Sequence, residues 1–214
     1  MTATATVDAI DPEVVALVNA AKEGDNRAFT QLYDRYVNQT YGYIYRRVGD
    51  RHLAEDLTGD VFLRAYRRLG TFQWQGVDLG AWIMTIARNR VHDHFKSART
   101  RMEHAAEIDA ERHSGDESDS PERVTMARDM ARTLGRALER LKADHREVIE
   151  LRFVHGMSVA DTAAVLERTI GATKALQYRA LRALSELVKD EPGLSELAAA
   201  SLAALTVLLA MLTP

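Results

Sequence analysis

The segment from Gly156 to Leu187 carries basic and aromatic residues at a spacing suited to reading DNA. A short helix is expected over Val159–Leu166, followed by a polar turn and a second helix from about Ile170, which Thr169 can cap. One face of the second helix is expected to pack while the opposite face enters a groove. The packing stripe comprises Leu176, Ala180, Leu184 and Leu187, and the opposite face comprises Gly171, Lys174, Tyr178 and Arg182. Helical bundles also contain such helix pairs, so DNA binding is at this level a hypothesis.

A second combination of aromatic and basic residues lies upstream, in a predicted loop and the helix that follows it. Aromatic rings stack on unpaired bases and basic side chains contact phosphates, so this combination fits single-stranded DNA better than duplex. The alternative is that Trp82 fills the core and Phe72 seals the loop, since large aromatic side chains are usually buried. The set comprises Phe72, Trp74, Trp82, Arg88, Asn89, Lys96, Arg99 and Arg101.

The sequence contains no convincing catalytic, metal or cofactor motif. His92 and His94 are two positions apart, so on a helix they point about 200° apart and cannot share a metal as an i, i+4 pair could. There is no Gly-rich phosphate loop and no nucleophile elbow. The absence of cysteine excludes disulfides and thiolate metal sites within this chain. We therefore predict a binding protein, not an enzyme, with no metal and no cofactor.

Helical spacing of apolar residues recurs along most of the chain and no strand-like alternation competes with it, which predicts an all-α fold. Gly24-Asp25 and Gly49-Asp50 are expected to separate successive helices. Helices are expected over Pro12–Glu23, from Gly24-Asp25 to Gly49-Asp50, and over His52–Leu69, Leu79–Lys96, Arg123–Lys142 and Asp144–Phe153, ahead of the helix-turn-helix.

Apolar residues at helical spacing are expected to form the core of the first group of helices. On the helix over His52–Leu69, the residues expected to point outward are Glu55, Thr58, Gly59 and Arg67 or Arg68. The residues expected in the core are Phe29, Leu32, Tyr33, Tyr36, Tyr41, Ile44, Tyr45, Val48, Leu53, Leu57, Val61, Ala65, Leu69, Ile83, Ala87, Val91 and Phe95.

Charge along the chain indicates two domains. The net charge is only −3, yet Ile86–Arg101 and Arg168–Lys189 each carry five basic residues against one acidic residue, whereas Glu103–Glu122 carries eight acidic residues against one Arg. Two basic segments therefore flank an acidic one, and each basic segment is a potential phosphate contact. The expected organisation is a disordered N-terminus (1–11), a helical domain (12–101), a flexible acidic linker (102–122), a second helical domain (123–190) and an apolar C-terminal helix (191–214).

The C-terminal segment carries no charge from Leu197 onward. About 16 to 18 apolar residues at ~1.5 Å each fall short of the ~30 Å hydrocarbon core of a membrane. Packing of this helix on the second domain or on a partner is therefore favoured over membrane insertion, which is the alternative. The N-terminus lacks the basic flank and apolar core of a signal peptide, so we expect a cytoplasmic protein.

Several motifs, taken in order, resemble the extracytoplasmic-function (ECF) sigma factors, the promoter-specificity subunits of bacterial RNA polymerase. The segments GDNRAFTQLYDRYVNQTYGYIYRRVGD, AEDLTGDVFLRAYRRL and AWIMTIARNRVHDHFKSARTR resemble their second conserved region. The segment LERLKADHREVIELRFVHGMS and the helix-turn-helix resemble their fourth region. The resemblance covers roughly Ala21 to Val188, and the preference for Arg over Lys is typical of a GC-rich, actinobacterial-like genome.

The resemblance implies a partner or a role for each group of residues. The implied partners are core RNA polymerase, duplex and single-stranded promoter DNA, and a cognate anti-sigma factor. Residues implied to dock on the clamp of the largest polymerase subunit are Glu55, Asp56, Thr58, Asp60 and Phe62. Residues implied to hold the melted minus-10 strand are Phe72, Trp74, Trp82, Arg88, Asn89, His92 and Lys96. Residues implied to face the minus-35 element are Arg168, Thr169, Lys174, Ala175, Tyr178, Arg179 and Arg182.

The chain departs from the usual family pattern at four positions, where it has Gly59, Glu167, Ile170 and Thr173 instead of Gln, Gly, Glu and Val. The resemblance also ends before the apolar C-terminal segment. Two other functions fit the residues: a helix-turn-helix regulator that binds duplex operators without polymerase, and a signalling adaptor that binds only protein. Operator binding without polymerase would support the first, and an absence of salt-dependent DNA association would support the second.

Overall fold

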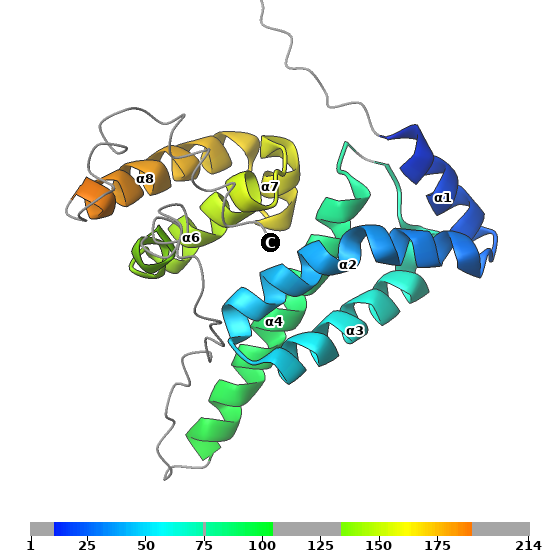
Figure 1. The fold of residues 1–214 in the computed structure, drawn as a ribbon, viewed down its shortest axis with the longest axis horizontal. Helices are drawn as coiled ribbons and strands as arrows, with labels where there is room; N and C mark the ends of the chain where they lie inside the picture. The colour runs from blue at the N-terminus through cyan, green and yellow to red at the C-terminus, as the bar shows by residue number, and fades with distance from the viewer. Residues whose placement is uncertain (1–10, 75, 105–133, 190–214) are drawn as a thin grey trace, which may run out of the picture. The chain divides into compact units, whose positions relative to one another are not determined.

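The computed structural model describes residues 11–74, 76–104 and 134–189, and these residues are helical apart from short connections (Figure 1). The chain divides into two compact units, Met1–Glu117 and Ser118–Pro214. No strand occurs within the described ranges, so the prediction of an all-α fold with two helical units is confirmed. The expected disordered N-terminus up to residue 10, the acidic linker and the apolar C-terminal helix lie outside the described residues.

The first unit contains α1 (Pro12–Lys22), α2 (Asn26–Val48), α3 (Arg51–Arg68) and α4 (Leu79–His104). An aspartate begins each of the first three, because its carboxylate accepts a hydrogen bond from a backbone N–H of the first turn. The distances are 2.9 Å for Asp11, 2.8 Å for Asp25 and 2.7 Å for Asp50. Gly49 ends α2 with φ of 70°, a left-handed conformation that glycine adopts without strain. The helix boundaries predicted at Gly24 and Gly49 are thus confirmed.

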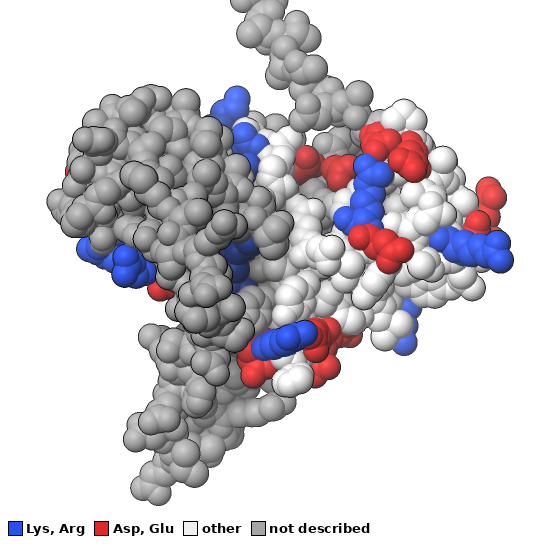
Figure 2. Space-filling model, in the orientation of Figure 1, with Lys and Arg blue, Asp and Glu red and all other residues white. Residues whose placement is uncertain are grey.

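Helix α2 packs against α1, α3 and α4, and α3 packs against α4 (Figure 1). The core between these helices contains mainly aliphatic side chains and one fully buried tyrosine, Tyr43. Its buried aliphatic side chains include Val14, Val18, Leu32, Ile44, Leu57, Val61, Ile83, Met84 and Ala87. On the face seen in Figure 2, acidic and basic side chains lie beside one another, so this face offers no field of a single sign for nucleic acid.

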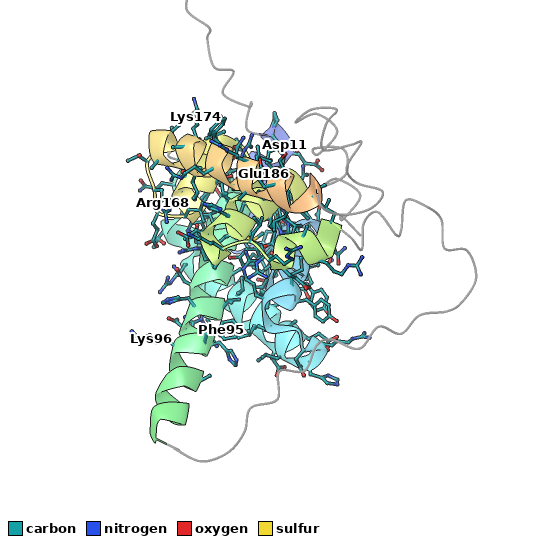
Figure 3. All side chains as sticks on the ribbon, turned by 90° about the vertical axis from the view of Figure 1, so that its left-hand side faces the viewer. Asp11, Phe95, Lys96, Arg168, Lys174 and Glu186 are labelled. Carbon is teal, nitrogen blue, oxygen red and sulfur yellow. The ribbon has the colours of Figure 1, made fainter. Side chains whose placement is uncertain are left out.

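The predicted core is wrong at three aromatic residues, which are exposed: Tyr33, Tyr45 and Phe95. On α2 the buried positions are taken instead by Thr40 and Tyr43, and the Thr40 hydroxyl donates to the Tyr36 carbonyl, 2.8 Å away. Helix α4 runs eight residues beyond its predicted end, and among its side chains up to residue 98, which the structure describes, Val91 is the last that is buried. Phe95 lies past that point, in the outer half of α4 (Figure 3). The helical spacing identified the face of α4 but not where its neighbours stop covering it.

The second unit contains a helical segment at residues 134–139, then α6 (Ala143–Ile149), which continues into a π-helical turn, η2 (Glu150–Val154). Helices α7 (Val159–Val165) and α8 (Ile170–Lys189) follow. Both α6 and α7 pack against α8, so the helix-turn-helix predicted from the sequence is confirmed. The predicted cap is also confirmed, since the Thr169 hydroxyl accepts a hydrogen bond from the Ala172 N–H at 3.2 Å. No helix in the described part of the chain has the length and apolarity needed to cross a membrane.

Glu167 lies in the turn between α7 and α8 with φ of 54°. This left-handed conformation is unfavourable by about 1–2 kcal/mol for a residue with a Cβ, whereas glycine adopts it freely. We expect Glu167→Gly to raise the free energy of unfolding of the second unit by about 1 kcal/mol. The gain is smaller than the full strain, because glycine also raises the conformational entropy of the unfolded chain. Thermal unfolding of the full chain measures this. Glu167→Ala is the matched control, because it removes the same side chain but keeps the strain; an equal gain from alanine would contradict the explanation.

Candidate nucleic-acid interface

The recognition helix α8 presents its predicted reading face to solvent. Lys174, Ala175, Tyr178, Arg179 and Arg182 are all exposed, and Tyr178 is 67% exposed. Figure 3 shows Lys174 extending away from the body of its unit. The opposite stripe packs as predicted: Leu176, Ala180 and Leu184 are buried, and Leu187 is half-buried. The helix thus combines a packed side with a side of basic and aromatic groups that is free to enter a major groove.

The turn before α8 uses two of the predicted phosphate contacts in interactions of its own. The guanidinium of Arg168 lies 2.7 Å from the carboxylate of Asp144 at the start of α6. An exposed ion pair of this kind contributes about 1 kcal/mol or less, so a DNA phosphate can replace the carboxylate. The Thr169 side chain caps α8, and its carbonyl accepts the buried Thr173 hydroxyl at 3.0 Å. The departure at Thr173 is therefore accommodated, because its hydroxyl has a hydrogen-bond partner within the helix.

The structure buries Phe72, so this ring is not the exposed stacking surface that the sequence predicted. Its centroid lies 4.8 Å from that of Trp74 and 5.2 Å from that of Trp82, both of which are half-buried. Lys22 Nζ donates to the Phe72 carbonyl at 2.5 Å and holds the loop on α1. The burial of Phe72 agrees with the alternative interpretation, that this ring seals the loop. Within this aromatic cluster of Phe72, Trp74 and Trp82, only the two tryptophans reach the surface.

Steric fit fixes where α4 begins. A Cβ on Gly80 would lie 2.8 Å from Cε1 of Tyr36, closer than side chains pack, so glycine lets α4 start against α2. The Asp78 carboxylate accepts the Gly80 N–H at 2.7 Å. Burial, together with the charge of Asp78, raises the pKa of Tyr36 to about 12, so this phenol stays neutral at physiological pH. Along the outer face of α4, Asn89, His92 and Lys96 are exposed and Arg88 is half-buried.

Helix α3 presents only part of its predicted docking face. Glu55 and Asp56 are exposed as predicted, but Thr58 and Phe62 are buried. The Thr58 hydroxyl donates to the Ala54 carbonyl at 2.6 Å, and the Phe62 ring packs edge-on against Tyr33 with centroids 4.8 Å apart. The apolar stripe of α3 is therefore two rows wide, and the sequence prediction assigned only one of them to the core.

Asp60, the remaining residue of the predicted docking face, is partly exposed but already paired. Its carboxylate accepts from Arg64, 3.1 Å away, and from Arg90 on α4. The ion pair with Arg90 joins α3 to α4, so Asp60 has a structural role in addition to any role at the surface.

Sequence reasoning missed an exposed apolar patch on α2 and α3. This α2–α3 aromatic patch consists of Phe29, Tyr33, Leu63 and Tyr66; Leu63 and Tyr66 are each 47% exposed, and the Phe29 and Tyr66 rings meet edge-on at 4.9 Å. The sequence contained a signal for this patch, because Leu63 and Tyr66 do not share the helical spacing of the α3 residues that pack in the core. A contiguous exposed apolar patch is often an interaction surface.

A packed helix-turn-helix with an exposed basic face, preceded by a second helical unit, defines the class: a helical DNA-binding transcription protein with two domains. The family model "Sigma-70 region 2" matches residues 32–101, and "Sigma-70, region 4" matches residues 131–184. The chain is similar to the ECF RNA polymerase sigma factor BldN of Streptomyces coelicolor, with 45% identity over 86% of this chain and 69% of that protein. It belongs to the ECF family of RNA polymerase sigma factors, and it directs promoter-specific initiation of transcription.

Two further similarities support this membership. The RNA polymerase sigma-H factor of Pseudomonas aeruginosa is 31% identical over 81% of this chain and 92% of that protein. The solved structure of the sigma factor RpoE in complex with the anti-sigma factor NepR, from Bartonella quintana, is similar with a TM-score of 0.58 and 25% identity, covering 76% of this chain and 98% of that one. The alternative function, a regulator that binds operators without polymerase, is not favoured.

Proposed function

We propose that the two units share promoter recognition: α8 reads the minus-35 element as duplex, while the first unit docks on polymerase and holds the melted minus-10 strand. The observation that carries this proposal is the reading face of α8. Lys174, Tyr178 and Arg182 project from the side opposite the buried stripe, so the helix can enter a groove without losing its packing. Arg and Lys at such positions contact guanine edges or phosphates, and the exposed ring of Tyr178 adds apolar contact with bases.

For the minus-10 strand, we propose that α4 and the aromatic cluster act together. Trp74 and Trp82 reach the surface at the start of α4, and Arg88, Asn89, His92 and Lys96 follow along its outer face. Aromatic surfaces accept unstacked bases while basic groups follow the backbone, which is the chemistry of single-strand capture. In this proposal the buried Phe72 ring packs against the two tryptophans and does not itself stack on a base. Extrusion of a base costs a few kcal/mol, so easily unstacked promoter positions are the favoured targets.

For polymerase docking, we propose that the acidic end of α3 and the α2–α3 aromatic patch form one surface. Glu55 and Asp56 supply charge, and Leu63 and Tyr66 supply apolar contact further along the same helix. Protein interfaces typically combine an apolar centre with a polar rim, and this surface has both parts. Thr58 and Phe62 support the surface from inside. The clamp of the largest polymerase subunit is the partner that the family implies.

Regulation by a cognate anti-sigma factor also belongs to the proposal. It is supported by the similar RpoE chain, which was solved in complex with the anti-sigma factor NepR. Because bacterial RNA polymerase transcribes in the cytoplasm, we propose that this chain acts there, and that its own role is binding and not catalysis.

Run-off transcription with core polymerase on a promoter library tests the proposal. We expect initiation from a small set of templates that share two sequence elements, one matching each unit. Substitution of Lys174 should relax selection at the upstream element only, and substitution of Asn89 should reduce opening at the downstream element only. Specific duplex binding that needs no polymerase and is unaffected at Asn89 would instead establish a conventional helix-turn-helix regulator.

Arg182→Ala is expected to weaken promoter binding by the holoenzyme about equally for all minus-35 sequences. The exposed guanidinium lies one turn beyond Tyr178, where it can neutralise a phosphate. Removal of one phosphate contact lowers the slope of log affinity against log salt by about 1. Titrations of labelled promoter at several salt concentrations measure the slope. Arg146→Ala, on α6, is the charge-matched control and should leave the slope unchanged. A loss confined to one minus-35 sequence would show that Arg182 reads a base.

A further inference from the structure

One guanidinium joins three segments of the second unit. Arg152 lies in the π-helical turn η2, and its Nε donates to Oε1 of Gln177 on α8 at 3.0 Å. Its Nη1 donates to the carbonyl of Met157, one residue before the Ser158 cap of α7. Both Arg152 and Gln177 are half-buried. The side chain therefore links the end of the α6 segment, the entry to α7 and the flank of the recognition helix.

Arg152 lies within the π-helical turn, from which its side chain reaches Gln177 and the Met157 carbonyl. The His155 N–H donates to the Glu150 carbonyl at 2.9 Å, and the Met157 N–H donates to the Leu151 carbonyl at 3.0 Å, so the chain is wider here than an α-helix. A π turn holds an extra residue, which changes the direction of the side chains relative to the rest of the helix. Such turns are rare and are frequently found at functional sites.

The packed stripe of α8 sets which side of the helix faces solvent, and a directional contact can fix the rotation more finely. Apolar packing is not directional, and the centre of the stripe is the small side chain of Ala180. A hydrogen bond from a guanidinium is directional and stronger than one between neutral groups. Gln177 lies on α8 directly before Tyr178 and three residues after Lys174. A constraint on Gln177 is therefore a constraint on the direction in which both reading side chains point.

We propose that Arg152 is a positioning residue for minus-35 recognition: it sets the rotation of α8 through Gln177 while anchoring the entry to α7 through Met157. This proposal rests on the proposed reading of the minus-35 element by α8. Arg152 touches no base in this role. By fixing the rotation of α8, it keeps Lys174 and Tyr178 in one orientation toward the base edges. Removal of Arg152 therefore lowers discrimination between sequences but leaves non-specific affinity for DNA in place.

The test uses the full chain with core polymerase, on a promoter selected from the library and on a template altered only in its minus-35 element. The ratio of initiation from the two templates is the discrimination. We expect Arg152→Met and Gln177→Leu each to lower this ratio about tenfold, as expected for loss of a charge-assisted hydrogen bond. The double substitution should be no worse than Arg152→Met alone, because Arg152→Met already removes the link to Gln177. Arg152→Lys should recover part of the ratio, since lysine can donate to one partner but not to both.

Arg146→Gln is the matched control, because it removes a basic charge from α6 and should keep the wild-type ratio. If Arg152→Met fails to fold, Gln177→Leu decides, since it keeps the anchor between Arg152 and Met157. A wild-type ratio in Gln177→Leu overturns the proposal. So does an equal loss of initiation from both templates, which indicates a purely structural role. If the wild-type protein itself shows no minus-35 discrimination, the proposed reading by α8 fails, and the proposal fails with it.

Discussion

Replacing Trp82 with alanine is expected to destabilise the first unit and to impair promoter opening together. The Trp82 ring is half-buried against Phe72, which in turn holds the loop on α1 through Lys22. Truncation of a buried tryptophan costs about 3–5 kcal/mol, so a half-buried one should cost about 2–3 kcal/mol. For a domain of this size, that corresponds to a fall of roughly 10–20 °C in unfolding temperature. Circular dichroism during heating measures this loss of stability.

Trp82→Phe separates packing from strand capture. Phenylalanine retains an aromatic ring against Phe72 and should regain most of the lost stability. It offers a smaller surface to an unstacked base, so opening of the minus-10 element, followed by the reactivity of unpaired thymines to permanganate, should remain below that of the wild-type protein. Normal opening by a folded Trp82→Ala protein would show that the aromatic cluster only packs the loop.

Local signals made much of the fold predictable. Gly49 ends α2 because its φ of 70° suits glycine, and Thr169 caps α8 because its hydroxyl reaches an N–H of the first turn. Both features depend on residues within a few positions of each other. The limits of the core depend on where neighbouring helices end, and the sequence contains no local signal for this. Phe95, which is 49% exposed, has the spacing of a core residue but lies beyond the buried part of α4.

The candidate site was predictable where a single helix defines it. The reading face of α8 follows from its spacing alone, because a helix with one packed stripe must present the opposite side. The unpredicted features join distant residues: Arg90 and Asp60 are 30 positions apart, and Arg152 and Gln177 are 25 apart. No periodicity indicates such pairs. Thr58 shows the same limit, since a residue with a hydroxyl can be buried when its own helix accepts the hydrogen bond.

The departures at the first turn of α8 leave its structure intact. Thr173 is buried and satisfies its hydroxyl on the Thr169 carbonyl, and Ile170 projects into solvent with 51% of its surface exposed. The proposed reading face therefore begins with an apolar side chain, where the resemblance to ECF sigma factors leads us to expect a carboxylate. A methyl-bearing base such as thymine is the partner that this chemistry favours in a major groove. The sequence preference of this chain should differ from that of relatives that keep the acidic residue.

Replacing Tyr178 with alanine should change sequence discrimination without changing stability. At 67% exposure the ring contributes little to packing, so the unfolding temperature should stay within a few degrees of wild type. A good base contact is worth about 1–3 kcal/mol, so selection for the cognate minus-35 element should fall by roughly 5- to 150-fold. Initiation from cognate and altered templates measures this ratio, and Tyr178→Phe shows whether the hydroxyl or the ring carries it.

Tyr66→Ala is the matched control, because it removes the same type of side chain from an exposed position of the first unit. It should lower initiation from both templates in proportion, since the α2–α3 aromatic patch is proposed to bind polymerase and not DNA. The contrast distinguishes the two surfaces: a lower ratio belongs to a group that reads bases, and an unchanged ratio with less product belongs to a group that recruits the enzyme. A Tyr178→Ala protein that keeps the wild-type ratio would remove this ring from the reading face and leave minus-35 selection to Lys174 and its neighbours.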